Sequence, residues 1–140
     1  MLIRLILVGT LIAVYQSASA QEFPVKPVRI LVGNPPGGTA DLIARQLAKH
    51  LSGVWQQSVI VDNRVGASGV IATDLASRAT PDGYTLLVSA PGPLTTQVIL
   101  SDKLPYDPLK DLTPITVLAV APSVLMVSTK VPAKTIAEQN

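Results

Sequence analysis

The sequence predicts an α/β domain with a doubly wound, mostly parallel sheet. Three short runs of β-branched and aliphatic residues alternate with two runs whose apolar residues recur at three- and four-residue spacing. The connections between these runs are short, which favours right-handed βαβ units. Charged residues make up only 14% of the chain, and this suits strands that are buried on both faces.

Residues 1–20 are predicted to be a signal peptide that precedes the domain. Arg4 supplies a positive charge, residues 5–15 form an apolar run, and Ala18 and Ala20 fit the small-residue cleavage pattern. The apolar run is shorter than the roughly 18 to 20 residues that span a bilayer. We therefore expect export with cleavage after Ala20 rather than a retained membrane anchor.

Charge and cysteine content exclude several classes of protein. The formal net charge is +2, and it falls to +1 without Arg4, which is too small to indicate nucleic acid or an anionic membrane as partner. The chain has no cysteine, so it has neither a disulfide nor a lipid attached through a cysteine. The folded domain must therefore be held together by its core.

The first half of the domain contains the clearest elements. Residues 28–32 predict a first strand, and the spacing of Leu42, Ile43, Leu47 and Leu51 predicts an amphipathic helix. Gly53 is placed to end this helix.

Less regular elements follow. Residues 58–61 predict a second strand, residues 71–79 a second helix, and residues 84–89 a third strand after a turn at residues 80–83. Residues 115–121 and 124–128 are apolar and predict two further strands, which Pro122 separates.

Three loops are expected at the carboxyl edge of the sheet, where ligands of such folds bind. These loops are residues 34–39, 62–68 and 89–93. In the first, Gly37 and Gly38 allow a ligand to approach the backbone closely. The N–H groups that open the following helix have no intrahelical acceptors, so they can hold a carboxylate without a lysine or arginine. The alternative is that the glycines only make a tight turn and that Thr39 caps the helix.

Asp41 has two possible roles in this loop. Stabilisation of the helix N-terminus, which contributes about 0.3–1 kcal/mol, is the commoner one, and contact with a ligand or a bound water is the other. The sequence leaves both open.

No set of catalytic residues is evident. His50 lies near the C-terminal end of the first helix, away from the predicted ligand edge, where it interacts favourably with the helix C-terminus. Residues 66–70 resemble a Gly-x-Ser-x-Gly nucleophile elbow but end in valine, and Ser68 has no histidine nearby to activate it. The first loop lacks the lysine of a P-loop. We therefore predict no catalytic residue, no metal site and no cofactor, and a binding protein rather than an enzyme.

Six segments together resemble the solute receptors of tripartite tricarboxylate transporters, the Bug family of periplasmic binding proteins. The segments are residues 23–30, 35–41, 63–67, 81–87, 104–111 and 131–135. The resemblance implies a two-lobed, type II periplasmic-binding-protein fold. Such a receptor closes on a small organic carboxylate in the periplasm and delivers it to an integral-membrane permease.

The resemblance also assigns ligand-binding residues. The carboxylate would face the backbone of Pro36, Gly37, Gly38 and Thr39, with Asp41 beside them. The turn at Gly66, Ala67 and Ser68 and the strand end at Ser89, Ala90 and Pro91 would line the cleft wall. Three departures from the family pattern concern the identity of the ligand: Gly33–Asn34 replaces a proline and an aromatic residue, Val65 replaces a proline, and Ser68 replaces a glycine.

Family members are about twice as long as this chain. The resemblance thus implies that residues 21–140 form the N-terminal lobe with the start of the inter-lobe region, and that the second lobe is missing. A capping-box pattern at Thr135 and Glu138, close to the last residue, agrees with truncation. Two alternatives remain: a fragment of an α/β enzyme whose catalytic groups lie in the missing half, and a nonfunctional truncated receptor.

Overall fold

The computed structural model describes residues 22–101 and 103–122, together with residues 124, 126, 128, 130 and 131. The predicted signal peptide and the predicted helix start at Thr135 lie outside these residues. Within the described part of the chain, no helix is both long enough and apolar enough to cross a membrane.

The centre of the molecule is a three-stranded parallel sheet. The strands are β1 (Val28–Val32), β2 (Val59–Asn63) and β3 (Thr85–Val88), in the order β2-β1-β3. Val32 pairs with Asn63 on one side and with Val88 on the other. All three strands therefore end at the same edge, and the predicted parallel α/β fold is confirmed.

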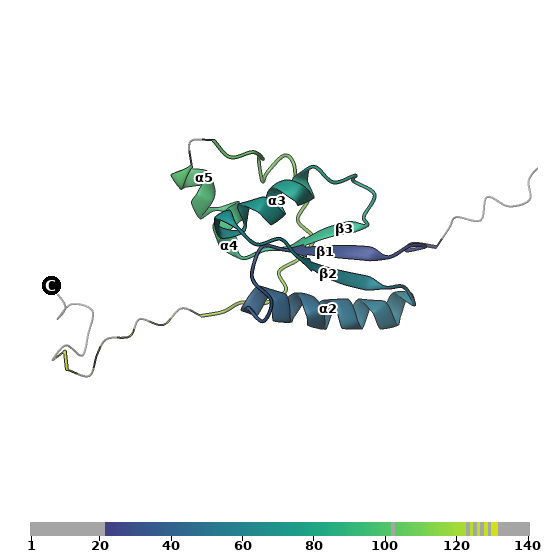
Figure 1. Cartoon of the computed structure of the whole chain (residues 1–140), viewed down its shortest axis with the longest axis horizontal. Coiled ribbons are helices and arrows are strands. Elements are labelled where there is room, and N and C mark those ends of the chain that lie inside the picture. Colours follow the sequence, from purple (N-terminus) through teal and green to yellow (C-terminus); the bar gives the residue numbers. More distant parts are fainter. Residues whose placement is uncertain are drawn as a thin grey trace, which may run out of the picture.

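Helices cover both faces of this sheet. Helix α2 (Thr39–Trp55) lies against one face, whereas α3 (Val70–Ser77), α4 (Pro91–Leu94) and α5 (Thr96–Leu100) lie on the other side (Figure 1). A short 3₁₀ turn, η1 (Ala67–Gly69), connects β2 to α3. This arrangement is the doubly wound one that the alternation of elements predicts, but the sequence did not predict α4 and α5.

The core lies between the sheet and α2. Alternate strand residues Ile30 and Val32 are fully buried, and they pack with Ala44 and Ala48 of the helix. Alanine at these helix positions lets the helix approach the sheet closely. Burial of each Val or Ile side chain contributes roughly 1.5–3 kcal/mol, so this face accounts for much of the stability of the domain.

Helix α2 continues beyond Gly53, where the sequence predicts that it ends. The residue in the left-handed conformation is Gln56, at φ 52°, and its side-chain amide donates to the Gly53 carbonyl oxygen at 2.6 Å. The ring of Trp55 packs edge-on against Phe23, with 5.7 Å between centroids. This tertiary contact stabilises the extension of the helix to Trp55, and it outweighs the tendency of Gly53 to end the helix.

The prediction of strands at residues 115–121 and 124–128 is wrong for the residues that the structure describes. Residues 115–122, 124, 126 and 128 have no regular secondary structure. Their side chains stay exposed, for instance Ile115 at 79% and Val120 at 86%. An apolar run becomes a strand only when a neighbouring strand satisfies its backbone groups, and in the described part of the chain the sheet ends at β2 and β3.

Candidate functional site

The three predicted loops meet beyond the carboxyl ends of the strands. A Cβ atom on Gly33, directly after β1, would stand 2.7 Å from the Cα of Gly69, which follows the β2 loop. A Cβ atom on Gly69 would in turn stand 2.7 Å from Cγ of Pro93 in α4. The loops after β1, β2 and β3 therefore touch one another and form a single surface at this edge.

The amino end of α2 opens onto this surface. The N-cap residue is Gly38, and its neighbour Thr39 is the first helical residue, so the alternative in which Thr39 caps the helix is wrong. The first helical hydrogen bond runs from the Leu42 N–H to the Gly38 carbonyl at 2.9 Å. Among the described residues, the N–H groups of Thr39, Ala40 and Asp41 have no acceptor. These free donors, at the positive end of the helix dipole, suit an anionic group.

Asp41 faces the protein and not the open edge. Only 1% of the residue is exposed. Its Oδ2 accepts from the Gly37 N–H and from Nε of Arg45, both at 2.8 Å, and its Oδ1 accepts from the side-chain amide of Asn63, also at 2.8 Å. The bond to Gly37 satisfies a donor just before the helix, so the structure supports the helix-stabilising role, and both carboxylate oxygens already accept hydrogen bonds from the protein.

The ionised form of Asp41 is strongly favoured. The hydrogen bond from Arg45, then those from the Gly37 backbone and the Asn63 side chain, hold the pKa of this carboxyl well below its usual range, against the opposing effect of burial. The same ion pair raises the pKa of Arg45. A buried carboxylate with this set of donors stays charged throughout the pH range of living cells.

Two residues of this network were not singled out from the sequence. The side-chain amide of Asn63, at the end of β2, donates to the Asn34 carbonyl at 3.0 Å and to Asp41, and its oxygen accepts from Arg45 Nη2 at 3.2 Å. The spacing of Asp41 and Arg45, one helical turn apart, signals an ion pair. No local signal indicates that Asn63 reaches them, because that contact depends on how the strands pair.

The second loop has an unusual backbone. Four consecutive residues, Gly66 to Gly69, have positive φ angles, and two of them are Ala67 at 45° and Ser68 at 54°. The Gly69 N–H donates to the Gly66 carbonyl at 2.9 Å and closes the turn. A non-glycine residue in this region costs of order 1–3 kcal/mol. Strain of this kind is concentrated at binding sites, where it fixes an exposed loop in one form.

Hydrogen bonds from buried side chains hold the second and third loops in place. The hydroxyl of Tyr106, a buried residue, donates to the Pro93 carbonyl at 2.8 Å. The fully buried Thr73 donates to the Gly69 carbonyl at 3.0 Å. These bonds tie the β2 and β3 loops to α3 and to the 104–111 segment.

Only one of the four first-loop residues predicted to contact a ligand through the backbone has a free N–H group among the described residues. Pro36 has no N–H, and the N–H groups of Gly37 and Gly38 are donated to Asp41 and to the Pro35 carbonyl. Thr39 therefore offers the free backbone donor of this set. The other predicted wall residues stay at least partly exposed at the shared edge: Gly66, Ala67, Ser68, Ser89, Ala90 and Pro91.

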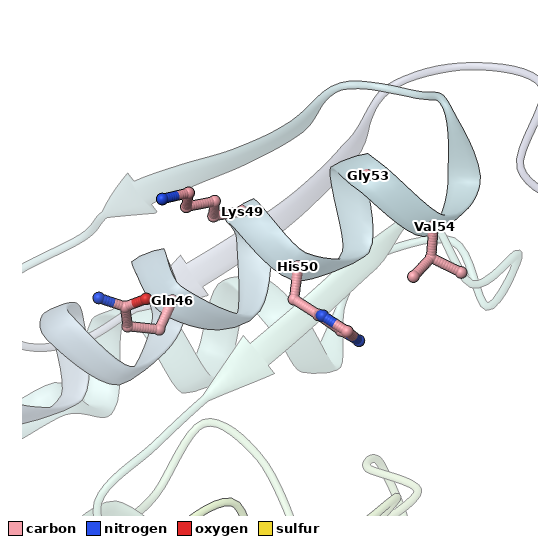
Figure 2. Close-up of a pocket in the computed structure, with 5 residues that line it drawn as sticks. All are labelled: Gln46, Lys49, His50, Gly53 and Val54. Carbon is pink, nitrogen blue, oxygen red and sulfur yellow. The ribbon is translucent and has the colours of Figure 1, made fainter.

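His50 lies elsewhere, as the sequence predicts. It is exposed on the outer side of α2 and, with Gln46, Lys49, Gly53 and Val54, it lines a shallow hollow (Figure 2). The side chains of Gln46, His50 and Val54 are spaced four residues apart and project from the same side of the helix. Across the described residues, no three His, Cys, Asp or Glu side chains gather as metal ligands would.

Comparison with known proteins now decides the family. Residues 43–139 match the sequence model of the family described as "Tripartite tricarboxylate transporter family receptor". The chain belongs to this family. This is a family of periplasmic substrate-binding receptors and not of enzymes, so the prediction that the chain comes from a receptor rather than from an enzyme is confirmed at the level of the family.

Curated relatives support the same assignment to the tripartite tricarboxylate transporter receptors. The chain is 42% identical over 113 residues to Protein BugT of Bordetella pertussis, and this match covers 80% of the chain and 35% of BugT. It is 36% identical over 128 residues to a protein encoded in the tcbD-tcbE intergenic region of a Pseudomonas species, with 89% of the chain and 38% of that protein covered. The chain thus spans well under half the length of these receptors.

Solved receptors confirm the fold. "R. palustris Rpa4515 with adipate" superposes with a TM-score of 0.74 at 36% identity, over 84% of this chain and 40% of that one. "MatC (Rpa3494) from Rhodopseudomonas palustris with bound malate" superposes with a TM-score of 0.65 at 36% identity, over 69% and 33%. Both of these family members are described with a small dicarboxylate.

Proposed function

We propose that the chain forms the first lobe of a periplasmic receptor that captures a small organic carboxylate for a tripartite tricarboxylate-type transporter. The observation that carries the proposal is the amino end of α2, where the N–H groups of Thr39, Ala40 and Asp41 are unpaired among the described residues. A carboxylate is one of the anions that such a group of backbone donors accepts without a basic side chain. Adipate and malate in two solved relatives agree with this class of ligand.

The cleft would have one wall on this lobe. The α2 terminus and the loops at Ser68 and Ala90 form that wall, and a second lobe would supply the facing one. Closure of two lobes excludes water from the ligand and strengthens each hydrogen bond to it. We accordingly propose that the receptor works in its two-lobed form and passes its ligand to an integral-membrane permease.

Thermal unfolding of the protein encoded by the complete gene tests ligand capture. Malate, adipate and citrate would be compared with adipamide, the neutral diamide of adipate. A ligand at a hundredfold excess over its Kd stabilises the folded protein by about 2.7 kcal/mol, so at least one carboxylate should raise the melting temperature and adipamide should not. A protein that no organic carboxylate stabilises would contradict the proposal.

A double substitution of Gly37 and Gly38 tests the role of the first loop in binding. Gly37 has φ +82°, and a Cβ atom on Gly38 would lie 3.1 Å from the Pro35 carbonyl oxygen. Replacement of both glycines with valine should therefore distort the loop and abolish binding of the carboxylate that stabilises the wild type. Micromolar binding that survives in this variant would remove the loop from the site.

Export is tested separately. Expression in a Gram-negative host followed by mass spectrometry of the periplasmic fraction should give a mature chain that begins at Gln21. A chain that retains residues 1–20 and is found in the membrane fraction would show that these residues are an anchor.

A further inference from the structure

The side chains that reach the first loop from α2 and β2 form one hydrogen-bonded network. It contains Asp41, Arg45 and Asn63, and it ends at two backbone groups of the loop, the Gly37 N–H and the Asn34 carbonyl. No side-chain polar atom that is buried among the described residues lacks a partner. The loop is therefore held from below at two points, one at each end of its glycine-containing turn.

We propose that Asn63 and Arg45 are positioning residues that hold the loop of residues 34–38 in its ligand-binding form. The inference rests on the proposed function, because it assumes that the amino end of α2 receives the ligand. Neither side chain needs to touch the ligand. Each acts through Asp41 and through the backbone of the loop.

Asn63 is the connection between the loop and the sheet. Both hydrogens of its amide are donated, one to the Asn34 carbonyl and one to Asp41, and its oxygen accepts from Arg45. All three bonds together fix the orientation of the side chain. An alanine at this position would leave a buried carboxylate oxygen and a loop carbonyl without their donor, and such groups are costly to leave unpaired.

Arg45 controls the charge of Asp41. Its Nε donates to Asp41 Oδ2 at 2.8 Å, and its Nη2 reaches Asn63. Arg45 is the charged group that faces Asp41 from α2. The loop and the end of β2 contribute Asn34, Gly37 and Asn63, none of which titrates.

The charged neighbours of Asn63 along the chain are engaged elsewhere. Asp62 and Arg64 pair with each other at 3.0 Å. Arg45 is the largest of several influences that lower the pKa of Asp41. Without it, Asp41 takes up a proton at a less acidic pH, and the protonated carboxyl accepts the Gly37 N–H less strongly.

A matched control exists on α3. Arg78 pairs with Asp74 through Nε at 2.7 Å, with the same spacing of four residues as Arg45 and Asp41. Both arginines are more than half exposed. The variants Arg45→Met and Arg78→Met thus remove the same kind of ion pair, one below the loop and one remote from it.

The first measurement is affinity in the protein encoded by the complete gene, with malate and adipate as probes in calorimetry. Asn63→Ala and Arg45→Met should each weaken binding roughly 10- to 100-fold, by analogy with the range seen when groups that orient metal-binding residues are removed. Arg78→Met should leave affinity unchanged. Equal affinities in Arg45→Met and Arg78→Met would overturn the inference.

A pH profile separates positioning from a general loss of stability. The pKa of Asp41 is lowered in the wild type, so the hydrogen bonds of its ionised form persist as pH falls through 3.8, the ordinary value. In Arg45→Met the pKa moves back toward that value, so the affinity relative to wild type should fall further as the pH drops from about 5 to about 3. Comparison at each pH cancels the titration of the ligand itself. Arg45→Lys keeps a cation beside Asp41 and should restore the wild-type profile, and a profile of Arg45→Met that stays parallel to wild type would count against the proposal.

A measurement without ligand distinguishes this inference from the proposed function. Exchange of the Gly37 amide hydrogen, followed by NMR, should be faster in Asn63→Ala and Arg45→Met than in Arg78→Met. If no carboxylate binds the wild type, the proposed function fails while the exchange rates still report on the loop. If the wild type binds a carboxylate but exchange and affinity are the same in all variants, the positioning role fails by itself.

Discussion

Gly33 lies so close to Gly69 that a Cβ atom on Gly33 would stand 2.7 Å from the Cα of Gly69. This contact joins the end of β1 to the loop that follows β2. A side chain at residue 33 would therefore push against backbone, which has little room to yield. Packing therefore requires a residue without a side chain at position 33 of this chain. A proline there would not fit unless the second loop moved.

The first prediction follows from this contact. Gly33→Ala should destabilise the domain by about 1–3 kcal/mol, the usual cost of overpacking, because the new methyl group meets backbone. Denaturant unfolding, with the midpoint and the slope both measured, gives the change in free energy. Gly53→Ala is the matched control: it lies within α2, and a Cβ atom there meets nothing within 4 Å.

The control carries its own expectation. Alanine in a helix interior is about 1 kcal/mol more favourable than glycine, so Gly53→Ala should stabilise the domain. The same substitution should thus have opposite signs at residues 33 and 53. A neutral or stabilising Gly33→Ala would mean that the loops after β1 and β2 can separate easily.

The second prediction concerns the strained turn. Ser68→Gly should leave stability unchanged or raise it by up to about 1 kcal/mol, because relief of the left-handed conformation outweighs the greater backbone entropy of glycine. Ser77→Gly, at the last residue of α3, should instead destabilise the domain, because glycine is unfavourable in a helix and the hydroxyl loses its bond to the Asp74 carbonyl at 2.9 Å. Melting temperatures of the two variants decide the matter, and a clear loss of stability in Ser68→Gly would show that the hydroxyl has a structural partner.

The sheet and the helices that cover it could be predicted because their signals are local. The run of β-branched and aliphatic residues at 28–32 and the helical spacing around Leu47 each depend on a few neighbouring residues, and both elements are found. The end of α2 could not be predicted, because the contact of Trp55 with Phe23 overrides Gly53. Residues 115–121 carry a strand-like pattern, but the described part of the chain provides no strand to pair with them.

Some features of the candidate site could also be predicted from the sequence and others could not. Its loops could be located from the sequence, since the carboxyl ends of parallel strands share an edge. The inward direction of the Asp41 carboxylate could not be predicted, because it depends on a contact between helix α2 and Asn63 at the end of β2. The assignment of residues 21–140 to the N-terminal lobe, with a second lobe beyond it, stays a prediction.

The third prediction concerns the aromatic contacts at the opposite edge of the sheet. Phe23 packs against Trp55 and against Tyr84, with 4.9 Å between the centroids of the latter pair, and the Val25 N–H donates to the Tyr84 hydroxyl at 3.0 Å. Phe23→Leu keeps an apolar side chain but removes the aromatic pairing, so it should cost about 0.5–1.5 kcal/mol for each pair lost. Trp55 is the chain's one tryptophan, so its fluorescence reports directly on this cluster. An unchanged emission spectrum together with unchanged stability would show that Phe23 does not anchor the segment before β1.

The fourth prediction is the effect of alkaline pH on the support of the third loop. Burial, the largest influence on Tyr106, raises the pKa of its hydroxyl, because the charged form is disfavoured away from water. The folded state therefore favours the neutral hydroxyl. Its contribution to stability is fully present below the ordinary pKa of 10.0 and is lost as pH rises through the higher folded-state value.

Tyr106→Phe isolates this contribution. The variant leaves the buried Pro93 carbonyl without its donor at 2.8 Å, so at pH 7 it should be about 1–3 kcal/mol less stable than wild type. Because phenylalanine does not titrate, the difference between the two proteins should shrink above about pH 10. Denaturant unfolding at pH 7 and at several alkaline values measures both effects. A difference in stability that stays constant with pH would mean that Tyr106 ionises equally easily in the folded and unfolded chains. The hydroxyl would then not be buried in its hydrogen bond to the Pro93 carbonyl.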